Sequence, residues 1–123
     1  EIMDFLGMAN YEQKYMMGLP FGIQKLAEIA RALVSKPKLI LLDEPAAGMN
    51  DQETREIANI IRDIRDELGI TVLLVEHDMN LVMSISDQIC VLESGKVIAS
   101  GDPSVIKNDP KVIESYLGEP ADA

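Results

Sequence analysis

The sequence predicts an α/β fold in which parallel strands are flanked by helices and followed by an antiparallel hairpin and a helical tail. Two short aliphatic runs, residues 39–42 and 70–75, lie on either side of a long amphipathic segment, residues 52–68. Unbroken aliphatic runs are typical of strands buried on both faces of a parallel sheet. A strand–helix–strand order then implies a crossover connection. Two further strand patterns joined through Glu93-Ser94-Gly95 are typical of a hairpin.

Apolar residues at intervals of three and four predict the helices of the first half. We expect a short helix over residues 2–9, a second over 22–35 that ends before Pro37, and a third over 52–68 that stops at Gly69. The residues expected to face the core from the two longer helices are Ile23, Leu26, Ile29, Ala30, Leu33, Ile57, Ile60, Ile61, Ile64 and Leu68.

The second half alternates short elements with capping signals. Asp78 is placed to cap a helix that runs to about residue 86, and strands are expected at 88–92 and 96–100. Pro103 and Pro110 each suit the first turn of a short helix. The tail residues expected to pack on the core are Val112, Ile113, Tyr116 and Leu117.

Composition narrows the class of protein. The chain has 123 residues, no Trp, two Phe and three Tyr, so its core must be mainly aliphatic. A net charge of −10 argues against nucleic-acid binding, which needs a basic surface. The single Cys90 excludes an internal disulfide, and its apolar neighbours predict a buried, inert thiol. No apolar run approaches the ~18 residues needed to span a bilayer, so any membrane association has to come through a partner.

Residues of catalytic type follow both predicted parallel strands. Asp43-Glu44 ends the first strand, and Glu76-His77-Asp78 ends the second. Ligands of open α/β sheets bind beyond the carboxyl ends of the strands, where carboxylates and an imidazole could hold a hydrated metal, orient water and contact phosphate. The alternative is structural: polar residues often follow strands, Asp78 also suits a helix cap, and a lone histidine is often a surface residue.

Four segments, in order, resemble motifs of the ABC-type ATPases. Leu19-Pro20-Phe21-Gly22-Ile23-Gln24 resembles the signature motif, and Leu39-Ile40-Leu41-Leu42-Asp43-Glu44-Pro45 resembles the Walker B segment. Ala46-Ala47-Gly48-Met49-Asn50 occupies the D-loop position, and Thr71–Asp78 resembles the strand with the switch histidine. The resemblance implies the core of a P-loop NTPase of the ABC type, of which this chain holds a part.

The resemblance also implies roles for individual residues. Asp43 would hold Mg²⁺, through water, and Glu44 would polarise the attacking water as general base. His77 would contact the γ-phosphate. The D-loop residues Gly48, Met49 and Asn50 would pass the state of one site to the other subunit.

The signature segment in this family acts on the nucleotide of a second, head-to-tail subunit. Here it comprises Pro20, Phe21, Gly22, Ile23 and Gln24. Gly22 would allow close backbone approach to phosphate, and the following helix would direct its N-terminal N–H groups at that phosphate. The commonest family signature is Leu-Ser-Gly-Gly-Gln, so Pro20 and Ile23 put its side-chain phosphate contacts in doubt. Asn50 likewise replaces the usual Asp of the D-loop.

With these departures, the signature-like and D-loop-like segments resemble those of one subfamily, the ATPases of branched-chain amino-acid importers. The tail from Asn108 to Glu119 also looks like their C-terminal extension. A related tail occurs in the ATPase of lipopolysaccharide export, which is therefore an alternative. The resemblance implies ATP and Mg²⁺ as cofactors of the parent protein. Its implied partners are a second ATPase subunit, transmembrane permease subunits and, indirectly, a substrate-binding protein. The implied location is cytoplasmic, at the inner face of the membrane.

A complete domain of this family also carries Gly-x-x-x-x-Gly-Lys-Ser/Thr, whose backbone cradles the phosphates. No such run occurs in the 123 residues, and Glu1–Leu6 starts inside a helical pattern without an initiator Met. We therefore expect a fragment with three parts: 1–21 from a helical subdomain, 22–100 from the ATPase core and 101–123 a C-terminal helical extension. Alone, it is expected to be inactive and to bind no cofactor. The alternative from another class is a non-enzymatic dimerisation or regulatory module.

Overall fold

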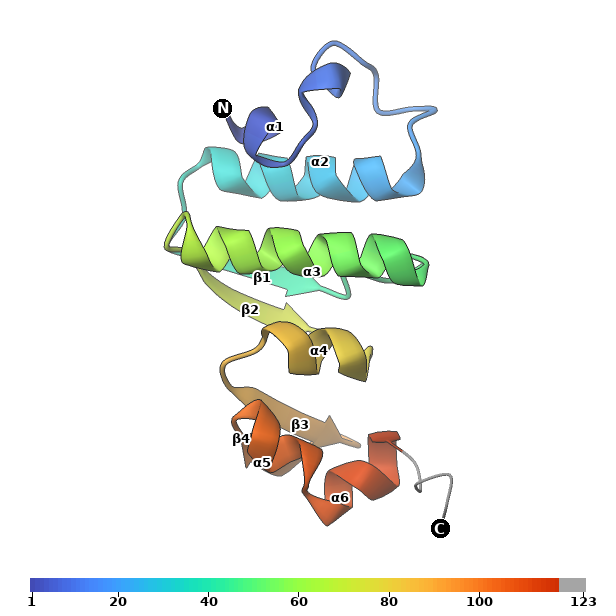
Figure 1. Ribbon diagram of the computed structural model, residues 1–123, viewed down its shortest axis with the longest axis vertical. Coiled ribbons are helices and arrows are strands. Elements are labelled where there is room, and N and C mark those ends of the chain that lie inside the picture. The colour runs from blue at the N-terminus through green and yellow to red at the C-terminus, as the bar shows by residue number, and fades with distance from the viewer. Residues whose placement is uncertain (118–123) are drawn as a thin grey trace. The chain divides into compact units, whose positions relative to one another are not determined.

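The computed structural model describes residues 1–117 and divides the chain into two compact units, Glu1–Glu76 and His77–Ala123. Figure 1 shows the elements in chain order. The first unit contains the parallel strands and the longer helices, and the second contains the hairpin and the tail. Each unit is described separately below.

The first unit confirms the predicted order of helices and strands. Its elements are α1 (Ile2–Phe5), the 3₁₀ turn η1 (Ala9–Tyr11), α2 (Phe21–Val34), β1 (Leu39–Asp43), α3 (Asp51–Asp66) and β2 (Thr71–Val75). The first helix is shorter than the expected 2–9, because the chain turns at Gly7, whose φ of +70° is left-handed. Gly69, with φ +66°, follows α3 where the helix stop was predicted.

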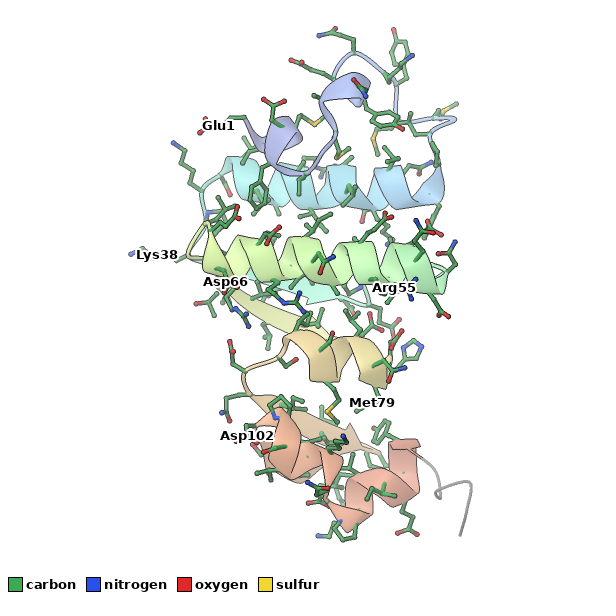
Figure 2. All side chains as sticks on the ribbon, in the orientation of Figure 1. Glu1, Lys38, Arg55, Asp66, Met79 and Asp102 are labelled. Carbon is green, nitrogen blue, oxygen red and sulfur yellow. The ribbon has the colours of Figure 1, made fainter. Side chains whose placement is uncertain are left out.

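Strands β1 and β2 pair in parallel, with a register that runs from Leu39 opposite Thr71 to Asp43 opposite Val75. The connection between them is α3, which packs against β2. In Figure 2 the labelled Arg55 lies near the start of α3, Asp66 marks its end, and Lys38 precedes β1. The carboxyl ends of both strands therefore lie beside each other.

The prediction that both strands are buried on two faces is wrong for this chain. Ile40 is 4% exposed, whereas Leu41 is 66% and Leu73 57% exposed. Side chains alternate between the two faces of a strand, so each strand has one half-covered face and one open face. An aliphatic run indicates that a strand suits burial on both faces, but the covering layers must be supplied from elsewhere in the fold.

The core of the first unit is aliphatic, as the composition predicted. Helix α3 contributes Ile57, Ala58, Ile61 and Ile64, and Ile64 is fully buried. Its predicted stripe also included Leu68, which lies after the helix and is 39% exposed. The remaining buried apolar residues of this unit are Leu6, Met8, Ile29, Ala30, Leu33, Ile40, Ala46 and Ile70.

The second unit is a hairpin covered by short helices. Its elements are α4 (Met79–Ile85), β3 (Ile89–Glu93), β4 (Lys96–Gly101), α5 (Pro103–Lys107), α6 (Pro110–Val112) and the π-helical turn η2 (Ile113–Leu117). Strands β3 and β4 pair antiparallel, with an irregularity between Val91 and Leu92. The predicted hairpin and both proline-initiated helices are confirmed.

One compact cluster holds this second unit together. Ile89 and Val91 of β3 pack with Ile106 and Val112, both of which are fully buried. Tyr116 is 41% exposed, and its hydroxyl donates to the carbonyl oxygen of Leu92. The side chain of Leu117 and residues 118–123 lie outside the described residues.

The prediction of a buried Cys90 is wrong, since the thiol is exposed. Ile89 and Val91 point to the core, and the period of two places Cys90 on the opposite face. Within residues 1–117 we find no helix that combines the length and the apolar character needed to cross a bilayer.

Candidate functional site

The carboxyl ends of β1 and β2 bring three carboxylates to one edge of the sheet. Asp43 and Val75 are the last paired residues of the two strands, so Glu44 and Glu76 leave the sheet at the same level. The backbone N–H of Glu44 donates to the carbonyl of Val75 at 2.7 Å, which continues the pairing one residue further. The expectation that the two polar clusters share an edge is confirmed for Asp43, Glu44 and Glu76.

Glu44 has a strained backbone. Its φ of +48° lies in the left-handed region, which few residues other than glycine adopt. Such a conformation costs about 1–3 kcal/mol and persists only where surrounding contacts impose it. Two hydrogen bonds do so here: Glu44 N–H donates to Val75, and Glu44 C=O accepts from Ala47 N–H at 3.1 Å. Strain of this kind concentrates at functional sites, and Glu44 is the residue that the Walker B resemblance marks as the base.

Glu76 stabilises the loop that follows β1. Its Oε2 accepts a hydrogen bond at 3.3 Å from the backbone N–H of Ala46, which is buried. The end of β2 therefore holds the turn that carries Glu44. The resemblance to ABC-type ATPases implies no separate role for Glu76, and only its position directly after the second strand indicated one.

His77 is exposed and directly follows Glu76 as the first residue of the second unit. Asp78 is the N-cap of α4, and its Oδ1 accepts from the N–H of Leu81 at 3.1 Å. This confirms the structural reading of Asp78 as a cap. His77 therefore directly precedes the N-cap residue of α4.

The start of α2 carries the signature-like residues. Pro20 is the N-cap residue and contributes no side-chain hydrogen bond to the first turn. The side-chain amide of Gln24 donates to Leu19 C=O at 2.8 Å, so it closes the turn within its own chain. Gly22 and Ile23 are partly buried, and the ring of Phe21 is half exposed.

The D-loop-like residues Gly48, Met49 and Asn50 directly precede α3. Asn50 is the N-cap, and its Oδ1 accepts from Glu53 N–H at 2.9 Å. Asn50 N–H donates to Glu53 Oε1 at 3.3 Å, which completes a capping box. Met49 N–H donates to Ala46 C=O at 3.1 Å, and Gly48 has a left-handed φ of +78°. The Asn at position 50 thus serves as a cap that needs no charge.

Asp66 and Asp102 are exposed carboxylates with lowered pKa values. The hydrogen bond from Arg65 lowers the pKa of Asp66, and the Ser104 hydroxyl lowers that of Asp102. Among residues 1–117, no group of three or more His, Cys, Asp or Glu side chains is arranged to hold a metal ion. Asp43 supplies a single exposed carboxylate. Mg²⁺ sites of nucleotide enzymes often take only one or two carboxylates, with phosphates and water as the other ligands, and Asp43 fits such a site.

Comparison with known proteins agrees with this fold. Residues 96–122 match the family model described as "Branched-chain amino acid ATP-binding cassette transporter". The chain is 44% identical over 117 residues to the high-affinity branched-chain amino acid transport ATP-binding protein LivG of Escherichia coli K12. It is 50% identical over 117 residues to BraF of Pseudomonas aeruginosa, described in the same words. Each alignment covers 95% of this chain and 46% of the relative.

Solved structures give the same result. The ADP conformation of MJ1267, an ATP-binding cassette of an ABC transporter, matches with a TM-score of 0.85 and 37% identity. That match covers 96% of this chain and 48% of the other. The cbiO1 protein of Clostridium perfringens, part of the ABC transporter complex cbiONQ, matches with a TM-score of 0.82 and 33% identity.

The parallel strands, the carboxylate edge and these matches define the class: the chain is part of an ABC-type ATPase. Within that class its sequence is similar to the ATP-binding proteins of branched-chain amino-acid transporters, in line with the predicted resemblance. The chain spans about half the length of the curated relatives it matches.

Proposed function

We propose that this chain is part of the energy-coupling ATPase subunit of an ABC importer for branched-chain amino acids. The observation that carries the proposal is the parallel register of β1 and β2, which puts Asp43, Glu44 and Glu76 at one edge. The names of LivG and BraF, both branched-chain amino acid transport ATP-binding proteins, support the cargo.

In this proposal Glu44 is the general base and Asp43 is the Mg²⁺ ligand. A base must accept a proton from water while it lies close to the metal but not on it, which a carboxylate adjacent to the ligand can do. When bound, Mg²⁺ would neutralise charge on the β- and γ-phosphates of ATP. His77 would donate a contact to the γ-phosphate. The strained turn at Glu44, held by Val75 and Glu76, would fix the direction in which the base leaves the sheet.

The signature residues Pro20, Phe21, Gly22, Ile23 and Gln24 would act on the nucleotide of a second subunit. With Gln24 bound to Leu19, phosphate contacts fall to the backbone N–H groups at the start of α2. Gly48, Met49 and Asn50 would form the loop that faces the other subunit. We assign residues 1–21 to a helical subdomain, 22–100 to the ATPase core and 101–123 to a C-terminal extension.

The partners in this proposal are a second ATPase subunit, permease subunits at the inner face of the membrane and, through them, a substrate-binding protein. The 123 residues alone lack the Gly-Lys-Ser/Thr cradle. We therefore expect no turnover and no stable ATP binding from this chain by itself.

Two experiments test the proposal. The first reads the gene upstream of Glu1, where an in-frame Gly-x-x-x-x-Gly-Lys-Ser/Thr about 100–150 residues earlier is expected, the length of one further stretch of domain. The second measures phosphate release by the whole gene product and by its Glu44→Gln variant, with Glu93→Gln as a matched control.

Loss of a general base is expected to lower kcat by about 10²–10⁴-fold, because the attacking water is no longer polarised. Glu93→Gln changes an exposed residue of β3 and is expected to leave kcat within about twofold, since exposed substitutions usually change little. Equal rates for Glu44→Gln and wild type would contradict the proposal. Failure of the whole gene product to hydrolyse ATP would instead favour the non-enzymatic module.

A further inference from the structure

The start of α2 and the loop before α3 touch at two places, and both contacts involve a glycine. The first contact joins Phe21 and Gly48. A Cβ built on Gly48 would lie 3.3 Å from Cε1 and 3.7 Å from Cζ of the Phe21 ring. The ring therefore lies directly on the backbone of the loop, in space that a side chain at position 48 would fill. The left-handed φ of Gly48 also disfavours residues other than glycine at this position.

The second contact joins Gly22 and Glu53. A Cβ built on Gly22 would lie 2.9 Å from Oε2 of Glu53, so the carboxylate occupies the side-chain position of Gly22. The other oxygen, Oε1, accepts from Asn50 N–H at 3.3 Å in the capping box of α3. One carboxylate thus caps α3 and lies against the first turn of α2. A negative charge there also suits the positive end of the α2 dipole.

The Phe21 ring also has a charged neighbour. Lys25 Nζ lies 5.5 Å from the ring centroid, within cation–π distance, and 3.7 Å from Glu28 Oε2. The ring is half exposed, yet Gly48 and Lys25 contact it from two elements. The Phe21 ring therefore fills the space between the first turn of α2 and the backbone of Gly48.

We propose that Phe21 and Glu53 are positioning residues that join the start of α2 to loop 46–50, so that the two segments move as one body. The inference rests on the proposed function, in which α2 faces a nucleotide and the loop faces the other subunit. A displacement of Gly48 moves the Phe21 ring, and through it the N–H groups of the first turn. Glu53 acts in the same direction, because a shift of the α3 cap moves the carboxylate that lies on Gly22.

The contact between the start of α2 and loop 46–50 can be tested on this chain by a measurement that does not require ATPase activity. The chain contains two phenylalanines, Phe5 and Phe21, so incorporation of 4-fluorophenylalanine gives two ¹⁹F signals. Phe5→Leu assigns them. We expect the Phe21 signal to move on Gly48→Ala and on Glu53→Gln, while the Phe5 signal stays in place. Glu56→Gln, on the exposed side of the same helix, is the matched control and is expected to move neither signal.

A Phe21 signal at the position of the free amino acid, unmoved by Gly48→Ala and Glu53→Gln, overturns the inference. The same labelling of the whole gene product provides a second measurement in which the signature segment is read in its complete domain. There the Phe21 signal is expected to respond to Gly48→Ala as it does in the chain alone.

The functional consequence is tested by kinetics on the whole gene product. Phe21→Leu is expected to lower kcat for ATP by roughly 10–100-fold, the effect of a misplacement of about 1 Å, with a smaller rise in KM. Phe21→Tyr keeps the aromatic ring that contacts Gly48. Its kcat is therefore expected to lie within about threefold of the wild-type value. Phe5→Leu is the control, with kcat expected to be unchanged.

The two ideas fail in different ways. If Glu44→Gln leaves turnover intact, the proposed function is wrong. If Glu44→Gln abolishes turnover but Phe21→Leu matches Phe5→Leu, the proposed function stands and the positioning role is wrong.

Discussion

The two units of this chain each contain one pair of strands, but they complete their cores differently. In the second unit the hairpin is covered by helices from the residues that follow it, and Ile106 and Val112 are fully buried. In the first unit the parallel pair leaves Leu39, Leu41, Leu73 and Val75 more than half exposed, whereas the hairpin leaves Leu92 and Val97 so exposed. An antiparallel pair closes through a tight turn and local helices, whereas a parallel pair needs a long crossover and cover on both faces. The unit that contains Asp43 and Glu44 is therefore the one whose strands leave more apolar surface open.

The largest expected effect is the loss of stability when a buried side chain is removed from either core. Ile64→Ala in α3 and Ile106→Ala in α5 each remove a fully buried side chain. Each is expected to lower the free energy of unfolding by about 2–5 kcal/mol, because a cavity replaces the lost contacts. Hydrogen exchange should show that Ile106→Ala mainly loosens residues of the second unit and Ile64→Ala mainly those of the first. Uniform loosening by both variants would show that the units do not have separate cores.

The next effect concerns the cap that joins loop 46–50 to α3. Asn50→Ala removes the acceptor for Glu53 N–H and is expected to cost about 0.5–2 kcal/mol of stability. Asn50→Asp keeps an acceptor oxygen and is expected to be close to wild type. Chemical denaturation followed by circular dichroism measures both. A stable Asn50→Ala variant would mean that the capping box contributes nothing to this unit.

A smaller effect, confined to the second unit, depends on pH. The Ser104 hydroxyl and the Val105 N–H donate to Asp102 and lower its pKa below 3.8. A depressed folded-state pKa means that the stabilisation is fully present above pH ~3.8, the unfolded value, and is lost as the pH falls through the folded one. Unfolding measured from pH 6 to pH 2 should show an acid-side loss of stability that Asp102→Asn reduces. An identical pH profile for the variant would contradict this cause.

The smallest effect on stability is expected from the double substitution Leu41→Thr with Leu73→Thr. This variant directly tests the exposed face of the parallel strands. Both side chains are exposed, so the pair of substitutions is expected to change unfolding by less than about 1 kcal/mol. Exposed apolar faces and unpaired strand edges favour association, so we expect the wild-type chain to self-associate and the double variant to do so less. Light scattering across concentrations measures this, and a strictly monomeric wild type would refute it.

Several features could be predicted from the sequence because they rest on local physics. Helix α3 has a strong 3.6-residue pattern and a glycine stop, and Asp78 lies where a cap was needed. The hairpin followed from a turn signal between two strand patterns. Asp43, Glu44 and Glu76 could be placed at one edge, since the ends of paired parallel strands coincide.

Other features could not be predicted, because they depend on contacts between distant segments. Cys90 lies in an apolar run, and only the pairing of β3 decided which face it occupies. The hydrogen bond from Ala46 to Glu76 joins residues 30 apart. The contacts of Phe21 with Gly48 and of Glu53 with Gly22 likewise join segments that no periodicity connects.

The sequence by itself determined the elements, their order and the residue types available at the sheet edge, because propensity, capping and periodicity act within a few residues. The tertiary structure alone decided which strand faces are covered, which way Cys90 points, and that the start of α2 lies on the loop before α3. Those outcomes are set by packing, which depends on which side chains meet in space and not on their spacing in the chain.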